Sequence, residues 1–478
     1  MDLDAFFKPS SVAVVGASRE PRKFGHVILK NFAESEFRGK TYPVNPKAEN
    51  VLGLKAYPNV REIPERLDLA IVAVPAPTVP SIVDDCLSKE VRACIIVSGG
   101  FREVGREGEK LEREVKRRIK GTTLRIIGPN CIGAYDPVSH VDTLFLPTYR
   151  LRRPRPGPIA FISQSGAFGS AVLDWAASQD VGISKFISIG NKIDVDEVDL
   201  LNYLMDDPAT KCITLYLESI ARGREFLEAS SRVAEKKPLI VLKGGVTQEG
   251  ANAALSHTGS LAGSAKVVQG AFEQAGIIEA RAVEELFDYA RALAYQPIPA
   301  DSRRIAVVSN GGGFGVISAD EVSKMGLSLA KFDPQTIGKL REKMPKYSTP
   351  RNPLDLVGDA DVERYRMALD VVSSDIDVGI VLVIVLLQTS FIESDVVDAI
   401  TESQLVHGKP TIVCTIGGEF TQILVKMLEE SRIPSYPTPE RAISAINALV
   451  RYSSALEERR HKEGSHAPHD RTVDRRLR

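Results

Sequence analysis

Three apolar stretches in this chain begin alike and recur at nearly equal intervals. They are VAVVGAS (12–18), IAFISQSGAFGS (159–170) and IAVVSNGGGFGV (305–316), and their starts lie 147 and 146 residues apart. Each stretch is rich in β-branched residues and runs into a turn of glycine or serine. This pattern is typical of the first strand, tight turn and helix of a doubly wound parallel sheet. The spacing therefore predicts an α/β protein with three such domains in series.

Segments rich in proline and arginine separate the three predicted domains. LPTYRLRRPRPGP (146–158) precedes the second unit, and YQPIPADSR (295–303) precedes the third. Such segments are typical of linkers. The predicted domains are therefore residues 1–150, 151–298 and 299–456. The final segment, 457–478, is charged and lacks an apolar period, so we expect it to be disordered.

The composition argues against several classes of binding partner. With a formal net charge of -1, the chain has no long-range field that would favour nucleic acid or an anionic membrane. Its most apolar stretch, VGIVLVIVLL (378–387), is much shorter than the roughly 20 residues of a membrane helix, which indicates a buried strand. The 5 cysteines are scattered without a C-x-x-C pair, and MDLDAFFKPS at the N-terminus does not resemble a signal peptide. We therefore expect a cytoplasmic protein with no bound metal, no nucleic acid and no membrane partner.

The first strand and turn predict a phosphate-binding site. Gly16, Ala17 and Ser18 place backbone N–H groups at the start of a helix, where a phosphate can bind. Nicotinamide dinucleotide sites usually have an acidic residue at the end of the second strand, but TYPVNPK (41–47) offers Asn45 and Lys47 instead. A lysine there favours a phosphate-rich nucleotide such as coenzyme A (CoA), although Lys47 taken alone favours an ordinary surface lysine.

Several motifs in a fixed order indicate a family. VAVVGAS, YPVNPK, VAVP, IVSGGF and GPNCIG are followed by FISQSGAFGS, SHTGSLAG, SNGGGFGV and NPLDLVG. Across roughly residues 3 to 455 this order resembles the α subunits of succinyl-CoA synthetases, and more closely the archaeal ADP-forming acyl-CoA (acetyl-CoA) synthetases. The resemblance implies an N-terminal Rossmann-like CoA-binding domain followed by two flavodoxin-like domains. It also implies a CoA site made of Gly16, Ala17, Ser18, Lys23, Asn45, Lys47, Val74, Pro75, Ser98, Gly99 and Asn130.

The same resemblance assigns a role to His257. This residue lies in ALSHTGSLAG (254–263), where small neighbours leave it little to pack against. Taken alone, the residues favour a solvated histidine without a chemical role, because short motifs often match by chance. In the family, the histidine of this loop is phosphorylated. Imidazole has a pKa near 6.5, so a good part of it is uncharged and nucleophilic at neutral pH.

A phosphohistidine needs hydrogen-bond donors, and two predicted helix N-termini can supply them. SQSG (163–166) opens a helix in the second domain, and NGGG (310–313) opens one in the third. Taken alone, NGGG is also consistent with a bare tight turn. The predicted phosphate-binding residues are Ser163, Gln164, Ser165, Gly166, Gly259, Ser260, Gly311, Gly312 and Gly313.

A nucleophilic imidazole also needs an acceptor that orients its ring. TLYLESI (214–220) is typical of a buried strand that ends at Glu218, and a carboxylate at this end of a strand faces the crevice of such a sheet. The resemblance gives Glu218 the orienting role, while a surface glutamate at the start of a helix is the structural alternative. Gly190 and Asn191 in IGNKIDVD are weaker candidates near the same edge.

Together these motifs imply the reaction acyl-CoA + ADP + phosphate ⇌ acid + CoA + ATP, by way of an acyl phosphate and a phosphohistidine. The chain shows no pattern of an ATP-grasp domain, so the resemblance implies a separate ATP-grasp β subunit that binds ADP or ATP with Mg²⁺, in an α₂β₂ assembly. Acetate is the acid that the resemblance suggests. The alternatives are a non-catalytic CoA-binding regulatory protein, a succinyl-CoA ligase-type enzyme for another acid, and an NAD-dependent dehydrogenase, which Asn45 argues against.

Overall fold

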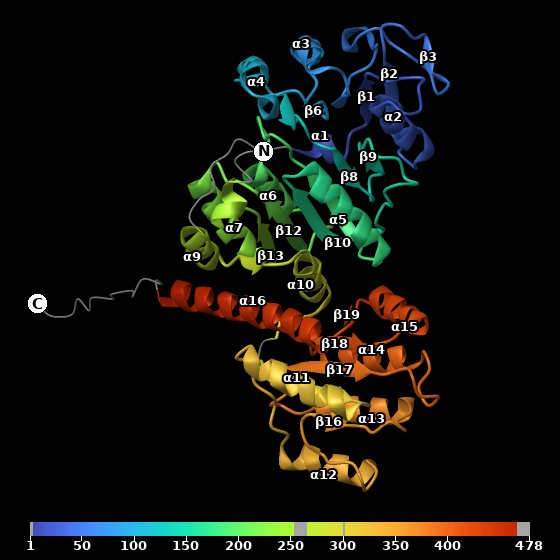
Figure 1. Cartoon of the computed structure of the whole chain (residues 1–478), viewed down its shortest axis with the longest axis vertical. Coiled ribbons are helices and arrows are strands. Elements are labelled where there is room, and N and C mark those ends of the chain that lie inside the picture. Colours follow the sequence, from blue (N-terminus) through green and yellow to red (C-terminus); the bar gives the residue numbers. More distant parts are fainter. Residues whose placement is uncertain (1–2, 253–264, 300–301, 466–478) are drawn as a thin grey trace, which may run out of the picture. The chain divides into compact units, whose positions relative to one another are not determined.

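The computed structural model describes residues 3–252, 265–299 and 302–465 (Figure 1). The chain forms two compact units, Met1–Tyr295 and Gln296–Arg478. The first unit contains two large sheets and the second unit contains one. All three sheets are built mainly from parallel strands with helices on both faces, which confirms the predicted α/β class.

The first sheet has the order β2-β1-β5-β6-β7, and all of its strands are parallel. Every residue of β1 (Ser11–Val15) is buried, because helices cover both faces of a parallel sheet. This explains why the strand is continuously apolar instead of alternating. The other strands are β2 (Lys40–Val44), β5 (Leu69–Val72), β6 (Ala93–Ile96) and β7 (Arg125–Ile127), and the helices are α1 (Asp4–Phe7), α2 (Phe24–Glu34), α3 (Val79–Ser88) and α4 (Arg106–Ile119). A short hairpin of β3 (Asn50–Val51) and β4 (Leu54–Lys55) follows β2.

The second sheet has the order β14-β13-β12-β10-β11-β8-β9. Its parallel strands are β10 (Pro156–Ser163), β11 (Ile183–Ser188), β12 (Cys212–Leu217), β13 (Leu239–Lys243) and β14 (Ile278–Ala280). Two short strands, β8 (Ala134–Asp136) and β9 (Val141–Asp142), extend this sheet in antiparallel pairing. The predicted boundary at residue 150 is therefore too late for the sheets. The sequence pointed to the proline-rich segment 146–158 as the boundary, whereas the pairing of β8 with β11 places residues before that segment in the second sheet. This pairing depends on contacts distant in sequence.

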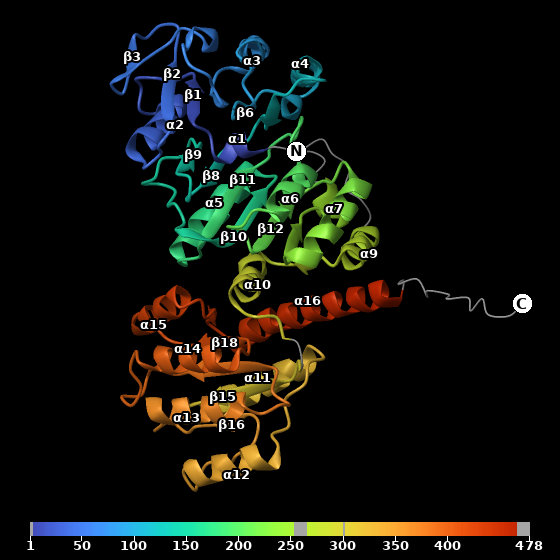
Figure 2. The same ribbon diagram turned by 180° about the vertical axis from the view of Figure 1, so that it is seen from behind.

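Helices cover both faces of the second sheet (Figure 2). On one face, Phe161 of β10 packs edge-on against Phe287 of α10, which also contacts Trp175 of α5. On the other face, the apolar side chains of α6, α7 and α9 join the buried core. These helices are α5 (Gly166–Ser178), α6 (Glu197–Met205), α7 (Gly223–Lys236), α9 (Ala265–Ala275) and α10 (Val283–Tyr295).

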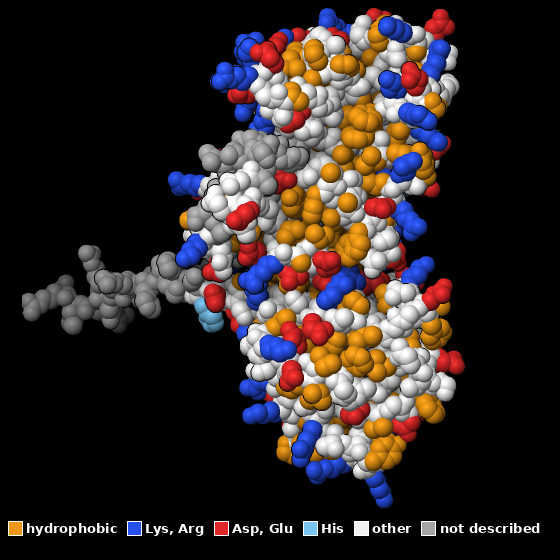
Figure 3. Space-filling view, viewed as in Figure 1, with side chains coloured by type: hydrophobic (Ala, Val, Ile, Leu, Met, Phe, Trp, Pro, Cys, Tyr) orange, Lys and Arg blue, Asp and Glu red, His pale blue; other side chains and the backbone are white. Residues whose placement is uncertain are grey.

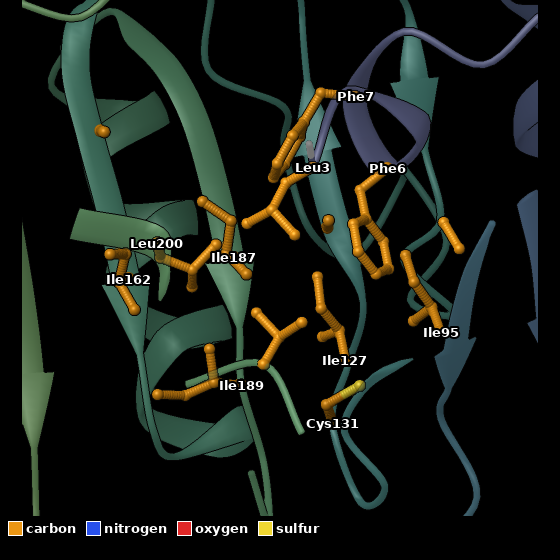
Figure 4. Close-up of a cluster of buried hydrophobic side chains, with 14 of the residues drawn as sticks. Leu3, Phe6, Phe7, Ile95, Ile127, Cys131, Ile162, Ile187, Ile189 and Leu200 are labelled. Atoms are coloured by element: carbon orange, nitrogen blue, oxygen red, sulfur yellow. The ribbon is translucent and has the colours of Figure 1, made fainter. Parts of the chain in front are cut away.

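The first two sheets share one hydrophobic core, which is why they form one unit (Figure 4). Phe6 and Phe7 of α1 are fully buried in this core. They lie among Ile95 and Ile127 of the first sheet and Ile187 of the second. Burying one large apolar side chain contributes about 1.5–3 kcal/mol, so this cluster fixes the two sheets firmly to one another.

The second unit contains the third sheet, in the order β16-β15-β17-β18-β19, with all strands parallel. The predicted buried strand at 378–387 is the central strand β17 (Ile380–Val385), whose residues are all buried. The other strands are β15 (Ile305–Ser309), β16 (Leu354–Asp355), β18 (Thr411–Thr415) and β19 (Ser435–Tyr436). The helices are α11 (Gly312–Lys324), α12 (Pro334–Lys343), α13 (Val362–Ser373), α14 (Val396–His407), α15 (Glu419–Glu430) and α16 (Pro439–Ser465).

Helix α16 corrects the first part of the predicted disordered tail, because the helix continues to Ser465, while residues 466–478 lie outside the described part of the chain. The helix is anchored before this point: Ser453 donates to the carbonyl of Pro299 at 2.6 Å, and Glu457 pairs with Arg303. The stretch EERRHKE (457–463) consists mostly of good helix formers with opposite charges at helical spacing. Charge density alone was therefore a poor indicator of disorder here.

On the face shown in Figure 3, side chains of Lys and Arg are interspersed with those of Asp and Glu over the surface of both units. Among the described helices, none combines the length and the apolar character that crossing a membrane requires.

Candidate active site

A cavity of about 560 Å³ lies in the first unit, between residues of the first sheet and residues of the second. It is formed mainly by loops at the carboxyl ends of strands, where ligands bind in open α/β sheets. Its walls are Phe24, Val97, Gly99, Arg102, Glu103, Asn130, Cys131, Ile132, Phe145, Gln164, Ser165, Gly166, Ala167, Gly190, Asn191 and Glu218.

The cavity brings together only part of the predicted site. It contains the predicted residues Gly99, Asn130, Gln164, Ser165, Gly166 and Glu218, and also the weaker candidates Gly190 and Asn191. The remaining predicted CoA residues of the first domain are not among its walls. His257, Gly259 and Ser260 lie outside the described residues. Gly311, Gly312 and Gly313 belong to the second unit.

The turn SQSG forms the N-terminus of α5, as the sequence predicts. Ser165 is the N-cap: its backbone is extended and its hydroxyl accepts a hydrogen bond from the N–H of Phe168 at 3.3 Å. Ser163 is fully buried, and its hydroxyl donates to the carbonyl of Ser165 at 2.7 Å. Ser163 therefore stabilises the turn from the buried side. Ser165 and Gly166 line the cavity at a helix N-terminus suited to an anion.

Gln164 ties the end of β10 to the end of β12. Its side-chain oxygen accepts hydrogen bonds from the backbone N–H groups of Glu218 at 2.9 Å and Ser219 at 3.0 Å. Its side-chain nitrogen donates to the hydroxyl of Ser219 at 3.0 Å. The amide is therefore a structural bridge that holds Glu218 next to the turn at the N-terminus of α5.

Glu218 is a buried cavity residue, with 7% of its surface exposed, and not a surface glutamate. The hydroxyl of Tyr216 donates to its carboxylate at 3.3 Å. Burial, together with the nearby carboxylate, raises the pKa of Tyr216 to about 12, so the phenol stays protonated and remains a donor at neutral pH. Phe168 stacks on the ring of Tyr216, with centroids 3.9 Å apart. The carboxylate of Glu218 is thus held by the hydroxyl of Tyr216, whose ring is fixed by packing against Phe168.

The polar wall of the cavity contains Asn191, a weaker candidate from the sequence, and charged residues that the sequence did not single out. The side-chain nitrogen of Asn191 donates to the carboxylates of Glu103 at 2.7 Å and Glu112 at 3.0 Å. Arg102 donates to the carbonyl of Asn191 at 2.6 Å. Asn191 comes after strand β11 of the second sheet, whereas Arg102, Glu103 and Glu112 come after strand β6 of the first sheet. This cluster therefore joins the two domains. In the sequence, the charges after IVSGGF are indistinguishable from an exposed helix start.

The two carboxylates that Asn191 contacts differ in electrostatics, and only Glu103 of the two lines the cavity. Burial alone would raise the pKa of Glu103, but hydrogen bonds from Asn191 and from the N–H groups of Gly100 and Phe101 lower it below its usual range. Burial raises the pKa of Glu112, and the attraction of Arg102 offsets only part of that effect. Glu103 is therefore the more firmly ionised of the two.

An apolar wall was also missed. Phe24 at the start of α2 stacks on Phe145, with ring centroids 4.1 Å apart, and both line the cavity. Val97 and Ile132 are buried side chains of the same wall. Half of the surface of Phe24 is exposed, at 50%, which is unusual for a residue this large. The cavity therefore combines an anion-binding turn with an apolar surface.

The predicted CoA residues outside the cavity cluster at the carboxyl edge of the first sheet. Gly16 has a positive φ of 93°, and a Cβ there would lie 2.4 Å from the carbonyl oxygen of Ala73, so the turn requires glycine. Asn45 donates to the carbonyl of Ala17 at 2.7 Å, which fixes this turn to the end of β2. The hydroxyl of Ser98 donates to the carbonyl of Val74 at 2.5 Å. Ser18 is half-buried, and Lys23, Lys47 and Pro75 are exposed.

In the second unit, the turn NGGG opens α11 in a similar way. The hydroxyl of Ser309 donates to the carbonyl of Gly311 at 3.0 Å. The side chain of Asn310 forms two hydrogen bonds with the backbone of Leu386, at 2.9 Å and 3.0 Å. Gly312 and Gly313 are exposed at the helix N-terminus. This turn therefore exposes a second helix N-terminus suited to an anion, and it lies in the second unit.

The fold and the cavity define the class: a Rossmann-like domain and a flavodoxin-like domain share a site that suits a phosphate and an apolar group. Comparisons with known proteins agree. Residues 10–137 match the CoA binding domain, and residues 156–293 match the succinyl-CoA ligase like flavodoxin domain.

Several relatives match nearly the whole chain. Subunit alpha of acetate–CoA ligase (ADP-forming) I from Pyrococcus furiosus is 39% identical over 95% of this chain and 98% of its own length. Acetate–CoA ligase (ADP-forming) I from Archaeoglobus fulgidus is 42% identical over 96% of this chain, which spans 65% of that longer protein. Acetyl-coenzyme A synthetase 1 of Ca. Korarchaeum cryptofilum, solved with phosphate and ADP, is 39% identical with a TM-score of 0.90 and covers 98% of this chain and 99% of its own. The chain therefore belongs to the family of ADP-forming acetate–CoA ligase α subunits.

Proposed function

We propose that this chain is the α subunit of an ADP-forming acyl-CoA synthetase, which catalyses acyl-CoA + ADP + phosphate ⇌ acid + CoA + ATP. One observation carries the proposal. A single cavity joins Gly99 and Asn130 of the CoA-binding domain to the phosphate-binding turn at Ser165 and to the buried acid Glu218. A thioester and a phosphate bound there would lie side by side, which is the geometry that their reaction requires.

The first chemical step is the attack of phosphate on the thioester. Phosphate binds at the N-terminus of α5, where Ser165 and Gly166 line the cavity. One of its oxygens attacks the carbonyl carbon of acyl-CoA, the C–S bond breaks, and the CoA thiolate takes the proton that phosphate releases. The products are an acyl phosphate and free CoA.

In the second step, His257 receives the phosphoryl group. The imidazole attacks phosphorus, and the acid leaves as a carboxylate. Glu218 accepts a hydrogen bond from the ring N–H, which keeps the other nitrogen free to attack. Gln164 and Tyr216 hold that carboxylate in place through their hydrogen bonds. The role of His257 rests on the SHTGS motif and the family, and the helix N-terminus at Gly312 is a second place where its phosphate can bind.

The rest of the reaction needs a partner. Relatives of matching length are named "subunit alpha", and the Archaeoglobus relative is a longer single chain. We therefore assign ADP, ATP and Mg²⁺ to an ATP-grasp β subunit in an α₂β₂ assembly. We take acetate as the acid and place its methyl group against the apolar wall of Phe24, Phe145 and Ile132.

The experiment that tests this proposal measures ATP formed from acetyl-CoA, ADP and phosphate. The purified chain should bind CoA and produce no ATP, and addition of an ATP-grasp partner should restore ATP formation. Robust ATP formation by this chain alone would refute the two-subunit assignment. Absence of CoA binding would refute the proposed function itself.

A further inference from the structure

The backbone at the end of β12 is held by an unusual set of side chains. The N–H groups of Glu218 and Ser219 both donate to Gln164. The carbonyl of Glu218 accepts from the ammonium of Lys243 at 2.7 Å, and the carbonyl of Ser219 accepts from the ammonium of Lys192 at 2.9 Å. All four backbone groups of these two residues are thus held by side chains, and two of the holders are cations.

The two lysines differ in how their charge is balanced. Lys192 pairs with the buried carboxylate of Glu197 at 3.1 Å. Lys243 is also buried, with 8% of its surface exposed, but its ammonium donates to the carbonyl oxygens of Glu218 and Gly244. Within the part of the chain that the structure describes, no Asp or Glu forms an ion pair with it. Burial lowers the pKa of Lys243, and the attraction of the Glu218 carboxylate offsets only part of that effect.

A buried ammonium without an ion pair is costly, so it calls for an explanation. Lys243 is the last residue of β13, directly beside the end of β12, where it reaches the carbonyl of the cavity acid. From there it fixes the peptide of Glu218, and it also places a positive charge behind the carboxylate.

We propose that Lys243 is a positioning residue for phosphoryl transfer: its ammonium holds the main chain of Glu218 so that the carboxylate stays directed into the cavity. This inference rests on the proposed function, because it assigns Lys243 to the site where phosphate and the thioester react. Lys243 itself is not among the residues that line the cavity, so it acts through Glu218.

The chain offers a closely matched control at the other end of the same strand. Lys237 precedes β13, is half-buried, and donates to two backbone carbonyls, those of Leu204 and Asp207, each at 2.7 Å. Burial lowers its pKa as well. Lys237 therefore has the same kind of structural role as Lys243, but it holds no residue of the cavity.

The test measures incorporation of labelled phosphate into the full-length chain from acetyl-CoA and phosphate, normalised to folded protein. Lys243→Met should reduce the maximal rate at least about tenfold, because small misplacements of a reacting group are costly, while the KM for acetyl-CoA stays within about twofold. Lys243→Arg, which keeps the charge and donors, should recover part of the rate. Lys237→Met should lower thermal stability to a similar degree as Lys243→Met and keep the wild-type rate.

Three results would overturn the inference. They are a wild-type rate in Lys243→Met, an equal loss of rate in Lys237→Met, and failure of both Lys243→Met and Lys243→Gln to fold, which would show a purely structural role. If the wild-type chain itself incorporates no phosphate with any acyl-CoA, the proposed function fails. If the wild type is labelled and Lys243→Met is labelled at the same rate, only this inference fails.

Discussion

The turns that open α5 and α11 are built alike but have different neighbours. In both, a buried serine at the strand end donates to a carbonyl two residues later, at 2.7 Å from Ser163 and 3.0 Å from Ser309. In both, the next side chain is an amide that bonds the end of an adjacent strand, Gln164 to Glu218 and Asn310 to Leu386. The adjacent residue is a buried acid in one case and a leucine in the other. The turn of α11 also has an acid nearby, since Asp355 of β16 lies beside Gly312, but the amide of that turn does not hold it. Turn geometry therefore creates a helix N-terminus suited to an anion, and the strand that the amide contacts decides whether the amide holds an acid there.

The largest expected effect comes from removing Glu218, the acid that the amide of the first turn holds. Glu218→Gln keeps the shape of the side chain but weakens control over the imidazole ring. We expect labelling by phosphate to fall on the order of a hundredfold, within the usual range for groups that control proton position. The dissociation constant of CoA should stay unchanged. Wild-type labelling kinetics in this variant would show that the difference between the two turns has no chemical meaning.

The amide bridges allow a direct comparison of the two turns. Gln164→Ala and Asn310→Ala each leave backbone groups at a strand end without a partner, at a cost of about 1–3 kcal/mol. Both variants should therefore unfold at lower temperature. Only Gln164→Ala should slow labelling by phosphate, because only Gln164 holds the cavity acid. Equal slowing in both variants would contradict this division of roles.

The carboxylates that Asn191 contacts, Glu103 in the cavity wall and Glu112 outside it, should differ in how stability depends on pH. The pKa of Glu103 is lowered in the folded chain, so its ionised form contributes stability above the usual pKa of glutamate, and this contribution is lost as the pH falls. Glu103→Gln should therefore be destabilising at neutral pH, and the difference from wild type should shrink in acid. The pKa of Glu112 is raised by burial, so Glu112→Gln should gain stability relative to wild type as the pH rises. Thermal unfolding across pH 3 to 7 tests both, and identical trends would contradict the opposite shifts.

The smallest effect concerns the N-cap that the two turns do not share. Ser165 accepts from the backbone with its hydroxyl, whereas Gly311 has no side chain to do so. Ser165→Gly makes the first turn resemble the second. It should cost only a few tenths of a kcal/mol in stability, because glycine is a tolerated cap, and raise the KM for phosphate. An unchanged KM for phosphate would show that the hydroxyl serves the helix alone.

Local patterns predicted much of the fold and a good part of the cavity. The three strand-turn-helix units, the buried strand β17 and the strand that ends before Glu218 could be predicted because a short stretch of sequence determines each of them. For the same reason, the turn of Ser165 and Gly166 lies where the motif placed it.

The parts that could not be predicted depend on contacts distant in sequence. The pairing of β8 with β11 places the boundary between the first two sheets before residue 150. The hydrogen bond of Asn191 with Glu103 joins residues 88 positions apart. The partnership of Lys243 with Glu218 is also formed only when β12 and β13 pair. The helical end of α16 was missed because its charged residues are compatible with disorder and with a surface helix alike.

The measurement that tests the central claim most directly is covalent labelling of His257. The full-length chain is mixed with acetyl-CoA and labelled phosphate, without ADP, and the modified peptide is identified. We expect an acid-labile, base-stable phosphate on His257, and no label in His257→Ala, whose CoA binding should be normal. A label on another residue, or equal labelling of His257→Ala, would contradict the account.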